Sequence, residues 1–170
     1  TTNLQLSSTK SPSEGFTLRA AMYPYIDPVT NVLVPADPCF DSSPIFNETT
    51  KTIICTGYPF AYSHNASDPE LDSISYEWDQ PLDDGFGATW NPGVNPPFVT
   101  FTGVSPLSVP YAFDNPIPGG VNLDPITGEI SYNSSVAGSF ATCVSVKSYK
   151  CGQLVAEVFR DIPAVLINCA

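Results

Sequence analysis

Residues 138–146 read GSFATCVSV and residues 153–168 read QLVAEVFRDIPAVLIN, and these two segments decide the fold. In the first, small or polar residues alternate with apolar ones at period two, which is typical of a half-buried strand. The second is rich in Val, Leu, Ile and Phe, as strands are. Cys151 and Gly152 lie between them, and Gly152 can adopt the positive φ that a tight turn needs. The segments therefore predict a long β-hairpin, in which Pro163 takes an edge position or a bulge because it has no N–H to donate.

Further short strands are expected upstream of this hairpin. Residues 121–132 read VNLDPITGEISY, and the turn-forming DPITG separates two short strands. Similar apolar stretches occur at residues 52–57, 58–63 and 73–79, and the last of them, SISYEWD, again alternates. No segment repeats apolar residues with helical spacing over eleven positions. The sequence predicts an all-β fold, a sandwich of about seven strands with Greek-key connections.

The composition narrows the possible partners. The chain of 170 residues has 17 acidic and 6 basic residues, which gives a net charge of −11, and its 18 prolines disfavour long helices. Nucleic acid and anionic membranes are poor partners for such a surface. Divalent cations match carboxylate oxygens better, although acidity can also serve solubility alone. No apolar run is long enough for a transmembrane segment, and Thr1 to Lys10 do not form a signal peptide, so a mature or excised fragment is expected.

The first 38 residues are interpreted as a separate N-terminal hairpin, and residues 39–170 as the sandwich. Residues 16–26 and 31–36 resemble two strands joined by a turn that starts at Asp27. This hairpin either completes the sandwich or ends a preceding repeat, because an isolated hairpin is only marginally stable. The Gly- and Pro-rich span of residues 80–120 is expected to pack on the sandwich, with one or two short strands near residues 98–102 and 109–113.

Five cysteines are disulfide candidates: Cys39, Cys55, Cys143, Cys151 and Cys169. No CxxC pair occurs, which disfavours a zinc cluster. Disulfides would form in an oxidising compartment, and an odd number leaves at least one thiol free or paired outside the chain. Cys143 is equally compatible with a reduced residue in the core. The pairing stays open at the level of the sequence.

An acidic turn is the candidate metal site. Asp68, Glu70 and Asp72 alternate along a turn that precedes a strand, and clustered carboxylates in a turn can bind calcium. The alternative is an Asp-Pro turn whose carboxylates accept hydrogen bonds from backbone amides. Asp124 is interpreted mainly as such a turn former, and Asp83 and Asp84 form a weaker second cation candidate.

Aromatic residues supply a candidate ligand site, whereas catalysis has little support. Trp90, in the Gly-rich loop, can stack on a sugar ring if it is exposed, or pack against the sandwich. Trp78 is expected in the core. His64 is the only histidine and is expected on the surface in a polar loop, and no P-loop, GxGxxG or HExxH motif occurs. We therefore do not expect an enzyme.

Several of these segments together resemble a known family. The relevant stretches are CFDSSPIF, TIICTGYPFAYSHNASDPELDSISY, LDPITGEISY and the hairpin KSYKCGQLVAEVFRDI, within residues 39–169. They are similar to the extracellular repeats of flavobacterial gliding-motility adhesins of the SprB type, which often have DPDGDSLxY where residues 68–76 read DPELDSISY. In the turn of this chain Leu71 stands where that motif has Gly.

The resemblance implies an Ig-like or cadherin-like sandwich, exported to the cell surface by type IX secretion. It also implies a non-catalytic role in adhesion to surfaces and in gliding motility. The expected partners are an extracellular surface or polysaccharide and neighbouring repeats of the same chain. A carbohydrate-binding module of a secreted protein is the alternative.

Overall fold

The computed structural model describes residues 19–35, 41–51, 53–82, 98–99, 101, 103 and 105–169, and these residues form an all-β structure without a helix. The strands are β1 (Ala20–Met22), β2 (Tyr25–Ile26), β3 (Leu33–Val34), β4 (Ile45–Phe46), β5 (Ile53–Cys55), β6 (Phe60–Ser63), β7 (Ala66–Ser67), β8 (Ser73–Trp78), β9 (Val121–Leu123), β10 (Glu129–Tyr132), β11 (Gly138–Lys150) and β12 (Gln153–Ile167). The prediction of an all-β fold is confirmed.

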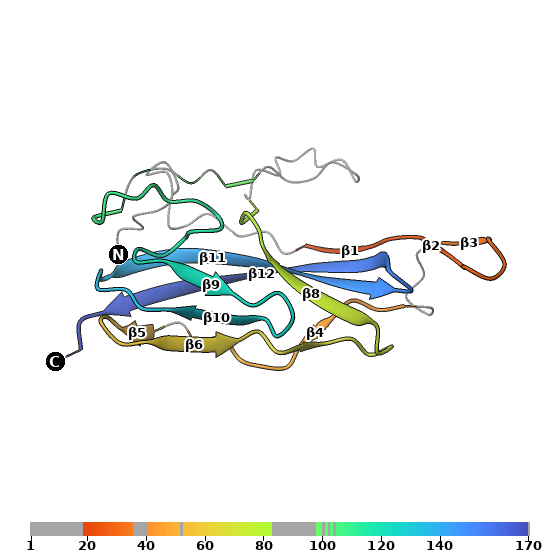
Figure 1. The fold of residues 1–170 in the computed structure, drawn as a ribbon, viewed down its shortest axis with the longest axis horizontal. Helices are drawn as coiled ribbons and strands as arrows, with labels where there is room; N and C mark the ends of the chain where they lie inside the picture. Colours follow the sequence, from red (N-terminus) through yellow and green to blue (C-terminus); the bar gives the residue numbers. More distant parts are fainter. Residues whose placement is uncertain are drawn as a thin grey trace, which may run out of the picture.

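The larger sheet is built on the hairpin of β11 and β12. Its order is β1-β12-β11-β8, and β5 also pairs with β12, in parallel, near the C-terminal end of that strand. The two long strands run along most of the long axis of the molecule (Figure 1). The predicted long hairpin is therefore confirmed, and it is the element on which the shorter strands assemble.

The turn of this hairpin and its proline behave as the sequence predicts. Cys151 and Gly152 have φ values of 48° and 79°, so both turn residues lie in the left-handed region that a two-residue hairpin turn requires. Pro163 pairs with Ala141 of β11 on one side. On the other side of β12, β1 begins at Ala20 opposite Val158 and β5 begins at Ile53 opposite Val165, so Pro163 lies between the two pairings. No strand among the described residues pairs with β12 at this point, so none of them needs the missing N–H of Pro163.

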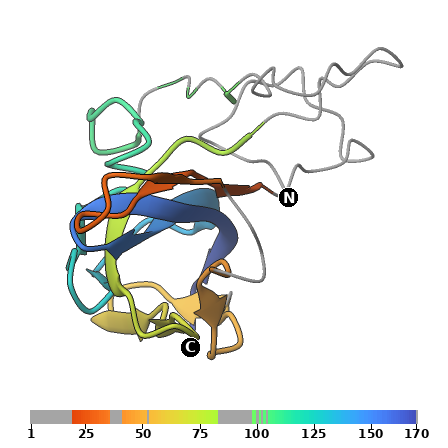
Figure 2. The ribbon, with the colours of Figure 1, turned by 90° about the vertical axis from the view of Figure 1, so that its right-hand side faces the viewer.

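A second sheet covers one face of the first. It has the order β6-β10-β9 and is antiparallel throughout. Figure 2 shows the two layers, with β11 and β12 (blue) on one side of the core and β6 (yellow) on the other. The core between them includes Tyr76, Ile117, Ile130, Phe140, Val144, Val146 and Leu166. A five-stranded sheet facing a three-stranded sheet is a β-sandwich, and the two-stranded sheets β2-β3 and β4-β7 complete the described strands.

The N-terminal strands divide between the sandwich and a projecting hairpin. β1 pairs with β12, with Ala20 opposite Val158 and Met22 opposite Ala156, so β1 is part of the larger sheet. β2 and β3 form a separate hairpin that extends beyond the turn of β11 and β12 (Figure 1). The domain boundary at residue 38 stays a prediction, although β1 is continuous with the sandwich.

The Gly- and Pro-rich span differs in part from expectation. Among its described residues, Ile117 is fully buried and Tyr111 nearly so, and both belong to the core. No strand forms at residues 109–113, where the sequence analysis predicted one; the stretch has only isolated bridges, at Pro110 and between Ala112 and Asn115. Pro110 lies within this stretch and Pro116 follows it, and their missing N–H groups disfavour a paired strand. That prediction was wrong, and the described residues 105–120 pack as irregular structure.

One disulfide joins Cys55, at the end of β5, to Cys169, beyond the end of β12. Cys143 is buried in β11, where burial raises the pKa of its thiol far above the usual range. Cys151 is exposed at the hairpin turn, and both of these cysteines carry free thiols. Cys39 lies outside the described residues, so its state is left open.

Candidate functional site

An acidic cluster forms at the end of the sandwich that carries the turn of β11 and β12. Asp68 and Glu70 come from the turn between β7 and β8, and Asp41 comes from the segment before β4. One carboxylate oxygen from each of the three residues lies within 4.8 Å of the others. Oxygens that ligate one calcium ion at 2.3–2.6 Å lie at most about 5 Å apart, so the spacing fits a calcium ligand set.

Asp68 organises the turn. Its Oδ1 accepts hydrogen bonds from the backbone N–H groups of Glu70 (2.9 Å) and Asp72 (3.2 Å). Its Oδ2 accepts a hydrogen bond of 2.7 Å from the hydroxyl of Ser148 on β11. Leu71 sits in this turn with a φ of 63° and donates its N–H to the carbonyl of Asp68. Asp68 therefore has the turn-forming role that the sequence analysis gave as the alternative to calcium binding, and its buried carboxylate is held in place by these bonds.

Asp41 is the member of the cluster that has a buried carboxylate oxygen without a hydrogen-bond partner. Its side chain is only 3% exposed, and its Oδ2 has no hydrogen-bond partner among the described residues. Burial raises the pKa of Asp41 above its ordinary value, although the charge of nearby Lys150 opposes this. A buried carboxylate oxygen without a partner costs free energy, and a bound cation would remove that cost.

Lys150 places a positive charge beside the acidic cluster. Its Nζ lies 2.9 Å from Asp72 Oδ2 and 3.4 Å from Asp41 Oδ1. Burial lowers the pKa of Lys150, but the hydrogen bond to Asp72 and the charge of Asp41 outweigh it and raise the pKa. Lys150 contacts two of the four carboxylates gathered here, those of Asp41 and Asp72, while those of Asp68 and Glu70 converge on Asp41. The cluster keeps an excess of negative charge that a divalent cation can balance.

The structure changes the set of three candidate metal ligands that the sequence suggested. Asp68 and Glu70 lie together, whereas Asp72 pairs with Lys150 and is outside the group of converging oxygens. Asp41 takes its place, and Glu70 is held near it because Glu70 Oε2 accepts hydrogen bonds from the N–H and hydroxyl of Ser42. Sequence reasoning missed Asp41 because 26 residues separate it from Asp68 and no motif links the two segments.

His64 is not a surface histidine, and that expectation was wrong. Its side chain is fully buried, and neither ring nitrogen has a hydrogen-bond partner among the described residues. The rings of Phe46, Tyr62 and Tyr76 surround it at centroid distances of 5.5–6.3 Å. Burial, together with the charge of Arg160, lowers the pKa of His64 to about 4. A neutral imidazole enclosed by aromatic rings is a packing residue in this fold.

The other candidate residues fall in three groups. Trp90, Asp83 and Asp84 lie outside the described residues, so their predictions stay open. Trp78 packs against the core as expected. Asp124 Oδ1 accepts hydrogen bonds from the N–H groups of Ile126 and Thr127, which confirms its turn-forming role.

Comparison of the chain with protein-family models, curated proteins and solved structures gave no match. Within the described ranges there is no helix that is long and apolar enough to cross a membrane.

Proposed function

We propose that this chain is a non-catalytic module of a large secreted cell-surface adhesin, which contributes to adhesion to surfaces and to gliding motility. In this proposal the sandwich is of the Ig-like or cadherin-like type and reaches the surface by type IX secretion. Its partners are an extracellular surface or polysaccharide and neighbouring repeats. The motifs within residues 39–169 supply the resemblance on which the family assignment rests.

The observation that carries the proposal is a β-sandwich closed by a disulfide. Cys55 and Cys169 tie the edge strand β5 to the end of the longest strand. Disulfides persist in oxidising compartments, and this favours a protein that works outside the cytosol. The net charge of −11 supports the same role, since it keeps a surface protein soluble and favours calcium over anionic partners.

Surface location and adhesion are tested together. Antibodies against the purified chain should label intact, unpermeabilised cells of the source organism. The labelled chain should also be retained under flow on glass, polystyrene or polysaccharide-coated surfaces more strongly than an unrelated protein of similar size and charge. Labelling only after permeabilisation, or retention equal to the unrelated protein, would contradict the proposal.

We further propose that the acidic cluster binds calcium through Asp41, Asp68 and Glu70. The orphaned Oδ2 of Asp41 and the three converging carboxylates support this. Calcium should raise the melting temperature of the wild-type chain, by an amount that corresponds to about 2.7 kcal/mol at a calcium concentration 100 times the Kd. The rise should be reversed by a chelator.

Asp41→Asn tests the calcium site, because it keeps the size of the side chain but removes its charge. It should lose most of the calcium-dependent shift, whereas Asp114→Asn, at an exposed aspartate away from the cluster, should keep it. Isothermal titration with calcium alone checks the binding directly. A wild-type chain without a shift, or equal shifts in the wild type and Asp41→Asn, would show that the cluster is not a calcium site.

A further inference from the structure

The hairpin of β2 and β3 exposes apolar side chains on a rigid support. Val29, Leu33, Val32 and Ile26 are 90%, 60%, 58% and 46% exposed. Hydrogen bonds hold the hairpin at the end of β2 and within its turn. The amide of Gln153 exchanges two hydrogen bonds with the backbone of Ile26, and in the turn Asp27 Oδ1 accepts hydrogen bonds from the N–H groups of Val29 and Thr30. A preordered apolar surface of this kind loses little entropy on docking.

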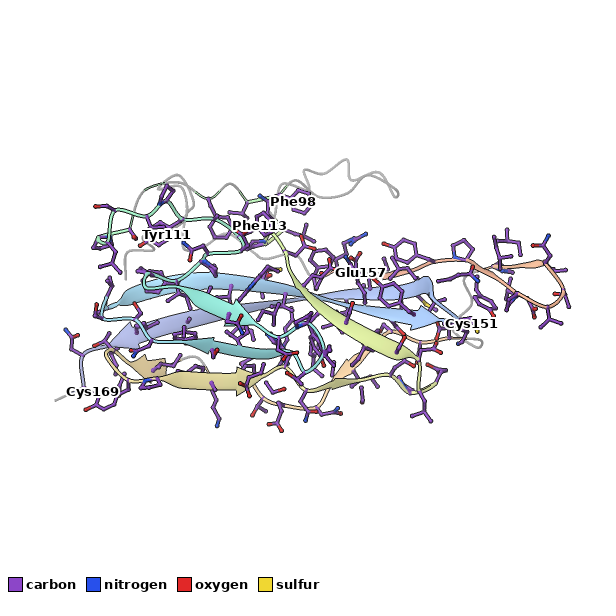
Figure 3. The ribbon with its side chains drawn as sticks, viewed as in Figure 1. Phe98, Tyr111, Phe113, Cys151, Glu157 and Cys169 are labelled. Atoms are coloured by element: carbon purple, nitrogen blue, oxygen red, sulfur yellow. A yellow bond between two sulfur atoms is a disulfide. The ribbon has the colours of Figure 1, made fainter. Side chains whose placement is uncertain are left out.

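The opposite end of the molecule has an apolar groove. The groove measures about 470 Å³ and is lined by Ile53, Ile54, Cys55, Tyr58, Pro59, Phe60 and Cys169. Ile53 and Tyr58 beside it are 69% and 64% exposed. Figure 3 shows Cys169, at the groove, and Cys151, near the hairpin, at opposite ends of the long axis. The chain therefore has a projecting apolar element at one end and an apolar recess at the other.

The charges of the two ends are complementary. Asp27 is the only charged residue between Tyr25 and Pro35. Among the described residues no charged side chain lines the groove, and Lys51 lines a neighbouring hollow that shares Phe60 with it. A net charge of −11 makes side-by-side contact between two copies unfavourable, whereas contact between these ends brings Asp27 of one copy toward Lys51 of another.

We propose that the hairpin of β2 and β3 docks into the groove beside the Cys55–Cys169 disulfide of a second copy of this chain. The contact is head-to-tail, with different surfaces on the two partners, so it can repeat and produce an open chain of modules. It extends the proposed adhesin role by adding association between modules, but it does not depend on the ligand or on calcium.

The test uses three variants that each add one negative charge at an exposed apolar residue. Val29→Asp changes the hairpin, Ile53→Asp changes the groove, and Ile126→Asp changes the turn of β9 and β10, where the side chain is 80% exposed and distant from both surfaces. Small interfaces are weak, so sedimentation equilibrium is run up to about millimolar concentration. The wild type and Ile126→Asp should show a weight-average mass that rises with concentration. Val29→Asp and Ile53→Asp should each stay monomeric.

The decisive experiment mixes the two variants that are each expected to stay monomeric. The Val29→Asp chain keeps its groove and the Ile53→Asp chain keeps its hairpin, so the mixture should form heterodimers and nothing larger. Circular dichroism checks that each variant is folded, and Tyr58→Asp replaces Ile53→Asp if that variant is not. A monomeric wild type, assembly of either variant alone, or a mixture that stays monomeric would each overturn the proposal. Loss of polysaccharide retention in Ile53→Asp with a monomeric wild type would assign the groove to a glycan instead.

Discussion

Three aspartates show how a single side chain shapes a turn in this protein. Asp27, Asp68 and Asp124 each precede a proline, and each accepts two backbone N–H hydrogen bonds through Oδ1. Each turn also contains a residue with positive φ, namely Asn31, Leu71 and Gly128. The backbone hydrogen bonds lower the pKa of Asp27 and Asp124. These turns depend on local chemistry, which is why Asp-Pro dipeptides mark them in the sequence.

His64 makes stability depend on pH. Its pKa is about 4 in the folded chain and about 6.5 in the unfolded chain, so the unfolded state binds more protons between these values. The free energy of unfolding should be greatest above pH 6.5 and should fall as the pH drops to 4, by about 3 kcal/mol from this group. Urea denaturation at a series of pH values measures the change.

His64→Phe isolates this effect, because Phe does not titrate and suits a site lined by Phe46, Tyr62 and Tyr76. The pKa values of Asp41 and Asp161 are also raised, mainly by burial, so these carboxyls add their own pH dependence to the stability. The difference between the wild type and the variant removes their contribution. Parallel pH profiles for the two proteins would show that His64 is not the source.

At the scale of elements, the turn between β9 and β10 fixes the smaller sheet against β8. Gly128 has a φ of 67°, and a Cβ added there would overlap the ring of Tyr76 at Cε1. The Tyr76 ring cannot move away easily, because it is 3% exposed and its hydroxyl accepts a hydrogen bond of 2.9 Å from the N–H of Ala66. Glycine is therefore needed here for two reasons: the backbone has a positive φ, and the ring of Tyr76 leaves no room for a Cβ.

Gly128→Ala should reduce the free energy of unfolding by about 2–4 kcal/mol, from the left-handed backbone and the overlap with Tyr76. Gly57→Ala is the matched control, since Gly57 has a φ of 77° but nothing within 4 Å of its added Cβ. That variant should lose only the backbone contribution, about 1–2 kcal/mol. Equal losses in chemical denaturation would mean that contact with Tyr76 adds no cost.

At the scale of the whole molecule, the Cys55–Cys169 disulfide closes the sandwich across a sequence separation of 114 residues. β5 has only three residues paired with β12, and the N–H of Thr56 adds a hydrogen bond to the carbonyl of Ile167. Such a short parallel pairing contributes little by itself, so the covalent link holds this corner of the fold together.

The double variant Cys55→Ala, Cys169→Ala should lose about 3–5 kcal/mol of stability, because the open chain regains loop entropy when it unfolds. Hydrogen exchange should show loss of protection in β5, while the centre of β11 stays protected. Cys151→Ala, at an exposed free thiol, serves as the control and should be neutral. An unchanged denaturation midpoint in the double variant would refute the role of the disulfide.

The sequence by itself determined the features that depend on neighbouring residues. Alternation at residues 138–146, the Cys151–Gly152 turn and the DPITG turn predicted β11, β12, β9 and β10, and the structure confirms them. These features are readable because backbone conformation and side-chain alternation are local properties. For the same reason the acidic turn at Asp68 could be identified as a candidate site.

Only the tertiary structure decided which distant segments meet. It chose one cysteine pair among the possible pairings, added β1 and β5 to the edge of β12, and brought Asp41 beside Asp68. It also buried His64, which stands in a polar stretch of sequence. These outcomes depend on how two sheets pack around a shared core, and the local pattern of residues carries little information about such long-range contacts.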